Sequence, residues 1–514
     1  MSEKRGKTSL VIFAMIASTL FSKALGLFRS MLLAWTLGDS QEAVAFAAAS
    51  KIPGAFFDII FSAAISGAFI PHYSTAKAEG EKSALFFFRA FFGAALAGGA
   101  LLSVTGMIFA PRIISFSAPG VTGATAALAS RLLRIMFPSA VFTSGVYTLS
   151  GLMQSRGRFI LPASVSAVSN IFILAYVIFS GKSFSVYTLA AVYVFSWCLQ
   201  LLVLALPLIV KKQMPLPTLR LKNPHFKKAL KSVPKIMVGS WLAPVSVLTA
   251  AFFSSFVSGE AFIAYDCASG IYTIISGVAV YGIGNYVFPA LSKAFTEGKK
   301  ELFAALLKKA LLGVTLIIIP VFCAVSVLSQ EGVTLLYAHG KFSDETALES
   351  ALSLRVLSLA MPAFAVSEIL YRALFAAGKP GAAVSATLAA IAASVAVNAF
   401  SLFWGGGLFG VCLAFVAAQW VHAFVLFLFA KEFLFFHTGE KYGVKAALLA
   451  PGFALCYAVM SFFKQNFGFF SKVEPSISIF LKITIVFTLG IVIYLLYVYV
   501  TGIFCPNLPK KEKR

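Results

Sequence analysis

Long apolar runs fill this chain, and they constrain its fold more than any other feature of the sequence. A helix that crosses a membrane needs about 20 consecutive apolar residues, and runs of that length recur along the chain. Apolar residues make up 60% of the chain and charged residues only 12%, whereas soluble globular domains are about a quarter charged. The composition excludes a soluble enzyme, a disordered chain and a coiled coil. It predicts an all-α polytopic membrane protein.

Loop residues divide the apolar runs into 14 predicted transmembrane helices. The predicted spans are 8–36, 43–74, 83–110, 123–154, 159–180, 185–210, 229–257, 261–291, 301–328, 346–376, 381–404, 408–430, 443–463 and 477–503. An even number of spans places both termini on one side of the membrane.

Positive charge indicates which side that is. Most loop Lys and Arg residues fall on the side of the termini, while the opposite loops hold Arg112, Lys182, Lys341, Lys464 and Lys472. Cytoplasmic loops of membrane proteins collect Lys and Arg. We therefore expect both termini in the cytoplasm, and we attribute the net charge of +23 to this bias rather than to nucleic acid binding.

An internal repeat divides most of the chain into two pseudo-symmetric lobes of six helices. Two patterns recur at matched positions: Pro71 to Ser74 resembles Pro289 to Ser292, and Arg131 with Pro138 resembles Arg355 with Pro362. The predicted domains are an N-lobe at 1–214, a basic cytoplasmic linker at 215–235, a C-lobe at 236–432, and two extra helices with a cytoplasmic tail at 433–514. The linker is expected to include an amphipathic helix lying against anionic headgroups. Parallel repeats of this kind are typical of alternating-access transporters, although channels and scaffolds also contain duplications.

Sequence signatures of catalysis and of metal binding are missing. The tripeptide Gly181-Lys182-Ser183 resembles the end of a phosphate-binding loop, but Tyr176 occupies the position of its first glycine. There is no HExxH motif and no CxxC pair, and the cysteines are scattered through the apolar runs. We expect no enzyme activity, no metal site and no cofactor.

Charged side chains inside the predicted spans point to a binding site, because each is costly there unless it faces a cavity or a partner. Lys23 and Arg29 lie in the first predicted span, and Lys51 lies in the second. We expect these cations to line a watery cavity between the lobes and to bind an anion, with phosphate as the natural candidate. The alternative is a structural role, in which they pair with carboxylates or with helix carbonyls.

Three carboxylates are candidates for the cavity or for ion coupling. Asp58 follows Lys51 by seven residues, so the two share a helix face about 10 Å apart, too far for a direct pair. Asp266 is a buried acid of the eighth predicted span and is a candidate to carry a coupling ion or proton. Glu42, near the outer end of the second span, is the third candidate.

Several short motifs occur in order along the first ten predicted spans. They are Phe21-Ser22-Lys23-Ala24-Leu25-Gly26-Leu27-Phe28-Arg29, Lys51-Ile52-Pro53, Ser66-Gly67-Ala68-Phe69-Ile70-Pro71, Ser117-Ala118-Pro119-Gly120, Phe288-Pro289-Ala290-Leu291-Ser292-Lys293 and His339-Gly340-Lys341-Phe342. In sequence and spacing these motifs resemble the MurJ/MviN family of lipid II flippases, within the MOP exporter superfamily. The predicted number of spans agrees with that family over the whole chain.

The resemblance implies a bacterial inner-membrane protein of peptidoglycan biosynthesis. Such a protein moves undecaprenyl-diphosphate-linked precursor, lipid II, from the cytoplasmic to the periplasmic leaflet. The cavity cations would bind the diphosphate, and the two extra helices would shape a groove for the polyprenyl tail. The membrane potential or a cation would drive transport without a cofactor. The expected partners are the lipid-linked precursor and membrane lipids, with cell-wall synthesis proteins as further candidates.

Individual positions agree with the family pattern only in part. Arg29 and Lys51 match basic residues of the family, Lys23 stands in place of an arginine, and Glu42 in place of an aspartate. Four other residues depart further: Ser30 for aspartate, Phe57 for arginine, Ser62 for glutamate and Gly270 for arginine. Two expected cavity cations are therefore missing. This leaves open a flippase for another polyprenyl-linked glycan, a MATE-like cation-coupled drug exporter, and a non-transporting scaffold.

Overall fold

The chain folds into helices that pack as two compact units. The computed structural model describes residues 2–57, 61–62, 64–212, 214–219, 223–240, 242–435, 442–466 and 475–503, and these residues contain no strand. Unit 1 consists of Met1–Asp266 with Gly340–Thr346, and unit 2 of Cys267–His339 with Ala347–Arg514. The all-α prediction is confirmed over the described residues. The predicted domain boundaries were drawn from a sequence repeat rather than from packing, and they stay a prediction.

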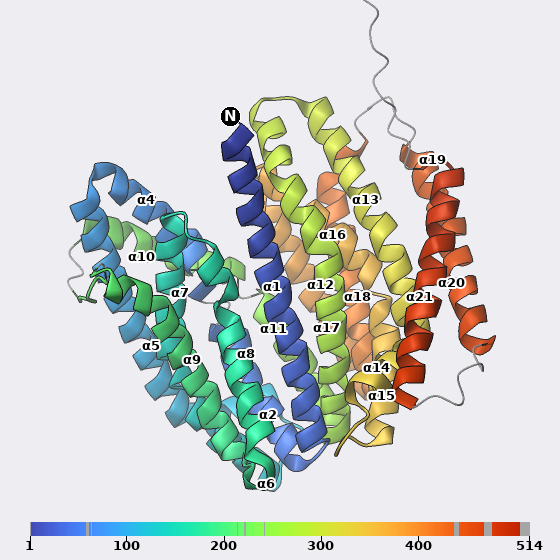
Figure 1. The fold of residues 1–514 in the computed structure, drawn as a ribbon, viewed down its shortest axis with the longest axis horizontal. Coiled ribbons are helices and arrows are strands. Elements are labelled where there is room, and N and C mark those ends of the chain that lie inside the picture. Colours follow the sequence, from blue (N-terminus) through green and yellow to red (C-terminus); the bar gives the residue numbers. More distant parts are fainter. Residues whose placement is uncertain are drawn as a thin grey trace, which may run out of the picture. The chain divides into compact units, whose positions relative to one another are not determined.

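Unit 1 contains the helices of the first half of the chain. They are α1 (Ser2–Leu37), α2 (Gln41–Ile52), the π-helices η1 (Pro53–Phe57) and η2 (Ile65–Phe69), α4 (Ile70–Glu79), α5 (Glu81–Ser117), α6 (Gly123–Met136), α7 (Ser139–Ser155), α8 (Ile160–Ser180), the 3₁₀ turn η3 (Gly181–Ser183), α9 (Val186–Val210), α10 (Pro224–Ser240), α11 (Leu242–Val257) and the start of α12 (Gly259–Thr296). Helix α1 packs against α8, α5 against α6 and α7, and α8 against α9 (Figure 1).

Aromatic side chains form much of the core of unit 1. Phe69 of η2 stacks on Tyr73 of α4 and on Phe87 of α5, with ring centroids 5.4 and 5.7 Å apart. Phe88 and Phe91 approach the same ring at 6.0 and 5.1 Å. Aromatic pairs at these distances stabilise a core beyond the area that they bury. The cluster fixes the irregular second span against α5.

The predicted second span at 43–74 is not one continuous helix. It is interrupted by the two π-helical segments η1 and η2 between α2 and α4. Pro53 begins η1, and a proline removes a backbone donor and crowds the preceding turn. π-Helical turns within α-helices are frequent at functional sites, and Lys51 lies two residues before the start of η1.

Helix α5 is longer than the sequence indicated. We expected the third span to end at residue 110, ahead of Pro111, but α5 continues through Pro111 to Ser117. Prolines are tolerated inside membrane-embedded helices, where neighbouring groups satisfy the freed backbone. The break was therefore predicted at a proline that the helix accommodates.

The segment Gly340–Thr346 belongs to unit 1 although it lies far along the chain. The Lys341 backbone N–H donates to the Trp35 carbonyl at 2.9 Å, and the Thr346 hydroxyl donates to Asp39 at 2.8 Å. Gly340 has φ +64°, and a Cβ there would lie 2.3 Å from the Trp35 carbonyl oxygen. The glycine of this sequence motif is therefore required by a close backbone approach.

Unit 2 contains the remainder of α12 and the later helices. They are α13 (Lys300–Val327), α14 (Ser329–Tyr337), α15 (Asp344–Ser358, whose first residues count with unit 1), α16 (Met361–Ala376), α17 (Pro380–Trp404), α18 (Gly407–Leu434), α19 (Tyr442–Ala447), α20 (Leu449–Asn466) and α21 (Pro475–Val500). Helix α13 packs against α16 and α20, and α17 against α18 (Figure 1).

Nine described helices are long and apolar enough to cross a membrane, or eleven if each of two bent helix pairs counts as one span. The bends are 43° between α6 and α7 and 46° between α15 and α16. They occur at Pro138 and next to Pro362, the two prolines that the sequence repeat pairs. The other three predicted spans correspond to α1, to the segments from α2 to α4, and to α10 with α11. None of these three is among the eleven candidates in the described part of the chain, so the count of 14 spans stays a prediction.

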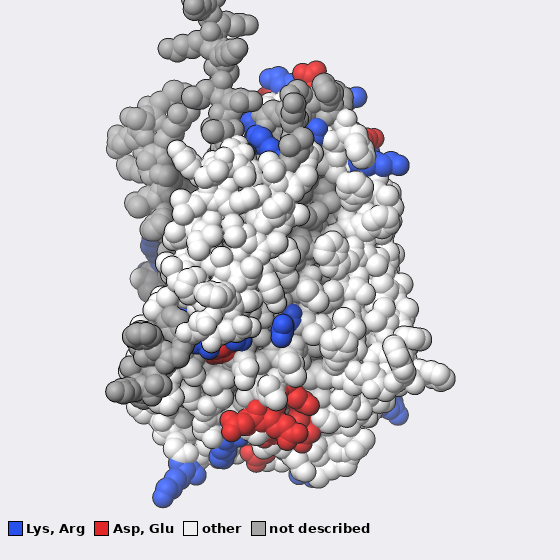
Figure 2. Space-filling view, turned by 90° about the vertical axis from the view of Figure 1, so that its right-hand side faces the viewer, with Lys and Arg blue, Asp and Glu red and all other residues white. Residues whose placement is uncertain are grey.

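The surface agrees with a membrane location. Figure 2 shows a face on which most charged side chains gather towards the two ends, with uncharged side chains over the expanse between them. A helix bundle in lipid needs such an uncharged belt, because charge is costly in the hydrocarbon region.

Candidate anion site and apolar groove

Lys51 occupies a nearly buried position at the end of α2. Its ammonium nitrogen lies 3.1 Å from Oδ1 of Asp266 and 4.0 Å from the centre of the Phe262 ring. The Lys51 side chain is 13% exposed and that of Asp266 is 46% exposed. A carboxylate and an aromatic face both attract an ammonium group. The side chain is thus held at the end of a helix and beside a half-exposed carboxylate.

The sequence suggested Lys51 as an anion ligand and Asp266 as a residue for ion coupling, and the structure brings the two side chains together within unit 1. Neither periodicity nor spacing could show this, because the two residues lie on different helices and far apart in the chain. The available signal was that each carries a charge inside an apolar span. Phe262, one turn before Asp266 on α12, gave no signal in the sequence.

Lys23 and Arg29 both lie on α1, and both side chains are half-buried. Their helix is fixed by Asn170 of α8, a buried residue whose amide donates to the Ser22 carbonyl at 3.0 Å. Asn170 is a positioning residue that sequence reasoning missed. A polar side chain in the apolar run of α8 was its only signal.

The remaining candidate carboxylates have different outcomes. Glu42 is exposed in the first turn of α2, two residues after Ser40, whose side chain caps the helix. A carboxylate there also interacts favourably with the helix dipole. Asp58 and its expected placement opposite Lys51 lie outside the described residues. The roles of Glu42, Asp58 and Asp266 in a cavity or in ion coupling stay predictions.

The structure accounts for two of the departures from the family pattern. Phe57 is buried, and its ring centre lies 5.9 Å from that of Phe137, so this position packs in the protein interior. Gly270 has no atom within 4 Å of the place where a Cβ would stand. The first position is filled by an apolar contact, and the second is open.

A groove of about 990 Å³ lies within unit 2, between α12, α13 and α21. Its walls are almost wholly apolar, with Lys309 as the cation and Tyr286, Tyr494 and Tyr499 as the aromatic residues that carry a hydroxyl. Tyr286 and Tyr499 are exposed, whereas Tyr494 is buried. A groove of this size and lining can take part of a long apolar chain.

Helix α21, which forms one wall of the groove, is held at its other end by an ion pair. Glu331 of α14 forms ion pairs with Lys482 of α21 at 2.9 Å and with Lys464 of α20 at 3.0 Å. Lys464 also donates to the Val327 carbonyl at 2.7 Å. We name Glu331, Lys464 and Lys482 the C-terminal ion cluster. Lys464 was expected only as a loop cation, and Glu331 was missed because an isolated glutamate carries no pattern.

Among the described residues, no three His, Cys, Asp or Glu side chains are grouped as metal ligands would be. The expectation that the chain needs no metal and no cofactor stays a prediction.

The geometry can be compared with known proteins. A sequence profile of the family described as lipid II flippase MurJ matches residues 33–500. The chain belongs to this family. The match covers the α2 lysine, the groove helices and the C-terminal ion cluster.

Two curated relatives agree with the MurJ assignment. The chain is 26% identical over 504 residues to a probable lipid II flippase MurJ of Buchnera aphidicola subsp. Schizaphis graminum, covering 96% of each chain. It is 28% identical over 363 residues to the lipid II flippase MurJ of Burkholderia cenocepacia, covering 68% of this chain and 70% of the relative.

Solved structures show the same fold. A lipid II flippase MurJ in an inward closed conformation has a TM-score of 0.78 at 22% identity, covering 95% of this chain and 99% of the other. An inward-facing MATE multidrug transporter of the MOP superfamily has a TM-score of 0.64 at 17% identity, covering 81% and 94%. The chain therefore shares the fold of these transporters, and the MurJ family assignment favours a flippase over a MATE-like drug exporter.

Proposed function

We propose that this chain is a lipid II flippase, which moves the peptidoglycan precursor from the inner to the outer leaflet of the cytoplasmic membrane by alternating access. The single observation that carries this function is the match to the MurJ family over residues 33–500. The chain is accordingly a multi-pass membrane transporter rather than an enzyme, and lipid II and membrane lipids are its partners. The bias of loop Lys and Arg supports cytoplasmic termini.

The diphosphate of the substrate binds to Lys23, Arg29 and Lys51. Lys51 supports this proposal, because its ammonium already lies between the Asp266 carboxylate and the face of the Phe262 ring. A diphosphate carries more negative charge than one carboxylate, so it competes with Asp266 for Lys51. Each charge-assisted hydrogen bond to such an anion contributes about 1.5–3 kcal/mol.

The polyprenyl tail occupies the groove of unit 2. The apolar walls from α12, α13 and α21 support this part of the proposal. An isoprenoid chain gains about 0.8 kcal/mol for each CH₂ group that it buries, and it needs no polar partner. The open side of the groove, at Tyr286 and Tyr499, lets the rest of the tail stay in lipid.

Energy for transport comes from the membrane potential or from a coupled cation. The half-exposed carboxylate of Asp266 is our candidate for that coupling, since its negative charge alternates between Lys51 and a cation. Glu42 and Asp58 stay secondary candidates, and cell-wall synthesis proteins stay candidate partners.

A flippase for another polyprenyl-linked glycan is the second candidate function. This candidate is favoured by Phe57 and Gly270, which stand where the family pattern has arginines. The Phe57 ring is buried and the space beside Gly270 is open, so neither position supplies a cation. Because every such substrate carries the same diphosphate and tail, the glycan would be distinguished by residues other than the three cations.

Complementation tests the proposal. The chain is expressed in a bacterial strain depleted of its own lipid II flippase, and the exposure of precursor on the periplasmic side is measured. We expect rescue by the wild type, loss of rescue with Arg29→Ala or Lys23→Ala, and partial loss with Lys51→Ala. Membrane levels of each variant are measured by immunoblot, because a loss of protein would also abolish rescue.

Lys300→Ala serves as the matched control, since it removes an exposed cation at the first residue of α13. It should rescue like the wild type. Normal rescue by Lys23→Ala with Arg29→Ala would end the assignment of the anion site. Failure of the wild type to rescue, with export of a cationic dye, would favour the drug exporter. Failure without dye export would favour another glycan.

A further inference from the structure

Residues 214–219, in the connection between α9 and α10, run along the side of α5. The Arg89 Nε donates to the Leu216 carbonyl at 2.9 Å, and the Thr218 backbone N–H donates to the Arg89 carbonyl at 3.0 Å. Gly93 permits this approach, because a Cβ there would lie 2.4 Å from the Thr218 carbonyl oxygen. Residues 214–219 are therefore fixed beside α5 between residues 89 and 93.

This position is at the depth of the membrane interface. Helix α5 has 37 residues, so it is about 55 Å long, against a hydrocarbon core of about 30 Å. If the helix extends equally beyond both faces of the hydrocarbon core, about 12 Å of it lies outside the core at each end. Arg89 lies eight residues after the start of α5, which is also about 12 Å.

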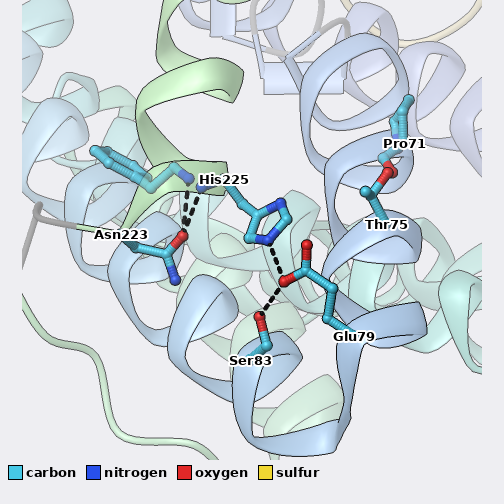
Figure 3. A network of polar contacts seen from close by, with 7 residues as sticks. Pro71, Thr75, Glu79, Ser83, Asn223 and His225 are labelled. Carbon is cyan, nitrogen blue, oxygen red and sulfur yellow. Dashed lines mark hydrogen bonds and ion pairs between the residues drawn. The ribbon is translucent and has the colours of Figure 1, made fainter.

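Helix α10 follows this connection in the chain and packs by its inner face against η2 and α4 (Figure 3). The Asn223 side-chain oxygen caps the helix by accepting from the backbone N–H groups of His225 and Phe226 at 2.8 and 3.1 Å. The His225 ring lies 2.7 Å from a carboxylate oxygen of Glu79, the last residue of α4. Ser83 donates to the same oxygen at 3.3 Å. The inner face is thus ordered by contacts within the protein.

The outer face of α10 combines lysines with a leucine. Lys227, Lys228, Leu230 and Lys231 are all exposed, and at 100° per residue they share one side of the helix. His225, Phe226 and Ala229 are buried on the opposite side. None of the three lysines forms an ion pair with a carboxylate that the structure describes.

Exposed leucines extend this surface into the preceding connection. Leu216 is 69% exposed, Leu219 is 65% exposed and Leu230 is 54% exposed. Leucines beside lysines at the level of the membrane interface are the pattern of a segment that lies in a lipid surface. Leucine side chains enter the acyl boundary, and lysines meet the phosphates of anionic lipids.

We propose that residues 214–219 and 223–231 form an interfacial anchor that binds anionic phospholipid headgroups. The partner is the lipid surface beside α5, and the anchor joins it to the end of α4 through His225 and Glu79. The proposal is independent of the transported substrate, because none of these residues belongs to the anion site or the groove.

Amide hydrogen exchange of the full chain in nanodiscs tests the anchor. Phosphatidylcholine discs are compared with discs in which a third of the lipid is phosphatidylglycerol. We expect exchange in 214–219 and 227–231 to be slower with phosphatidylglycerol, by about fivefold for each lysine engaged. The difference should shrink at high salt, because salt screens the attraction.

Two variants and a control decide the outcome. Lys227→Gln, Lys228→Gln and Lys231→Gln together should abolish the lipid difference, while Leu216→Ser with Leu219→Ser should speed exchange in both lipids. Lys293→Gln, Lys299→Gln and Lys300→Gln together remove the same charge from the end of α12 and the start of α13 and should preserve the difference. Equal exchange of the wild type in both lipids, or a difference retained by the first variant, overturns the proposal. Protection seen in native membranes but not in these discs would also overturn it, by assigning the surface to a protein partner.

Discussion

The C-terminal ion cluster provides a direct test of what holds the groove helix α21 in place. The change is Glu331→Gln, which keeps the shape of the side chain and removes its charge. Glu331 is 11% exposed, and Lys464 and Lys482 are 28% and 25% exposed. After the change, two largely buried ammonium groups face a neutral amide.

The magnitude follows from the two contacts that are lost. Each charged hydrogen bond contributes about 1.5–3 kcal/mol, and breaking a fully buried ion pair costs about 3–5 kcal/mol. Both lysines keep some access to water, and Lys464 keeps its bond to the Val327 carbonyl. We expect Glu331→Gln to lower the free energy of unfolding by about 2–4 kcal/mol.

The assay is unfolding of the purified protein by titration with SDS in mixed micelles, followed by tryptophan fluorescence. Glu331→Gln is compared with Lys464→Gln plus Lys482→Gln, and with all three changes together. Because the residues share one network, the triple variant should be no less stable than Glu331→Gln alone.

Glu297→Gln is the matched control. Glu297 also lies near two lysines, at 3.7 Å from Lys293 and 2.7 Å from Lys299, but the group is exposed. Exposed ion pairs contribute little, so this variant should unfold like the wild type. Equal losses for Glu331→Gln and Glu297→Gln, or additive losses within the cluster, would refute the reasoning that burial makes the cluster strong.

Four further outcomes are expected from the same structure. Burial raises the pKa of Glu331, but the contacts from its two lysines outweigh burial and hold the pKa below the usual 4.5. The cluster therefore stabilises the folded protein above pH 4.5. The stability advantage of the wild type over Glu331→Gln should vanish when the SDS titration is repeated at lower pH. Asp266→Asn should lower stability by about 1–2 kcal/mol in the same titration, since Lys51 is nearly buried while Asp266 is half-exposed, and no loss would mean that the pair is not formed. Asn170→Ala should lower stability by about 1 kcal/mol and speed amide exchange around Ser22, whereas unchanged exchange there would exclude its positioning role. Gly270→Ala should be neutral or stabilise by up to about 1 kcal/mol, because a Cβ meets open space there, and a loss of folded protein in size-exclusion chromatography would contradict this.

Much of the fold could be predicted from the sequence. Apolar runs over 160–180, 186–210, 300–327 and 475–500 are helices long enough to span a membrane, as expected. The prolines of the repeat at Pro138 and Pro362 mark the two bent spans. These features are local, because the cost of placing each residue in lipid depends on that residue and its immediate neighbours.

The irregular parts could not be predicted in the same way. Pro53 interrupts the second span with a π-helix, while Pro111 lies inside an unbroken α5. The sequence shows a proline in both cases. Whether a helix bends there depends on neighbouring groups that satisfy the backbone, and these come from other helices.

The sequence by itself determined that the chain is helical, lies in a membrane and carries scattered charges within apolar spans, since hydropathy is a sum over single residues. It also carried the motifs of the MurJ family. Only the tertiary structure decided which charges meet: Lys51 with Asp266, and Glu331 with Lys464 and Lys482. The reason is physical, because the attraction between two charges depends on a separation of a few ångströms, and that separation is set by the packing of helices far apart in the chain.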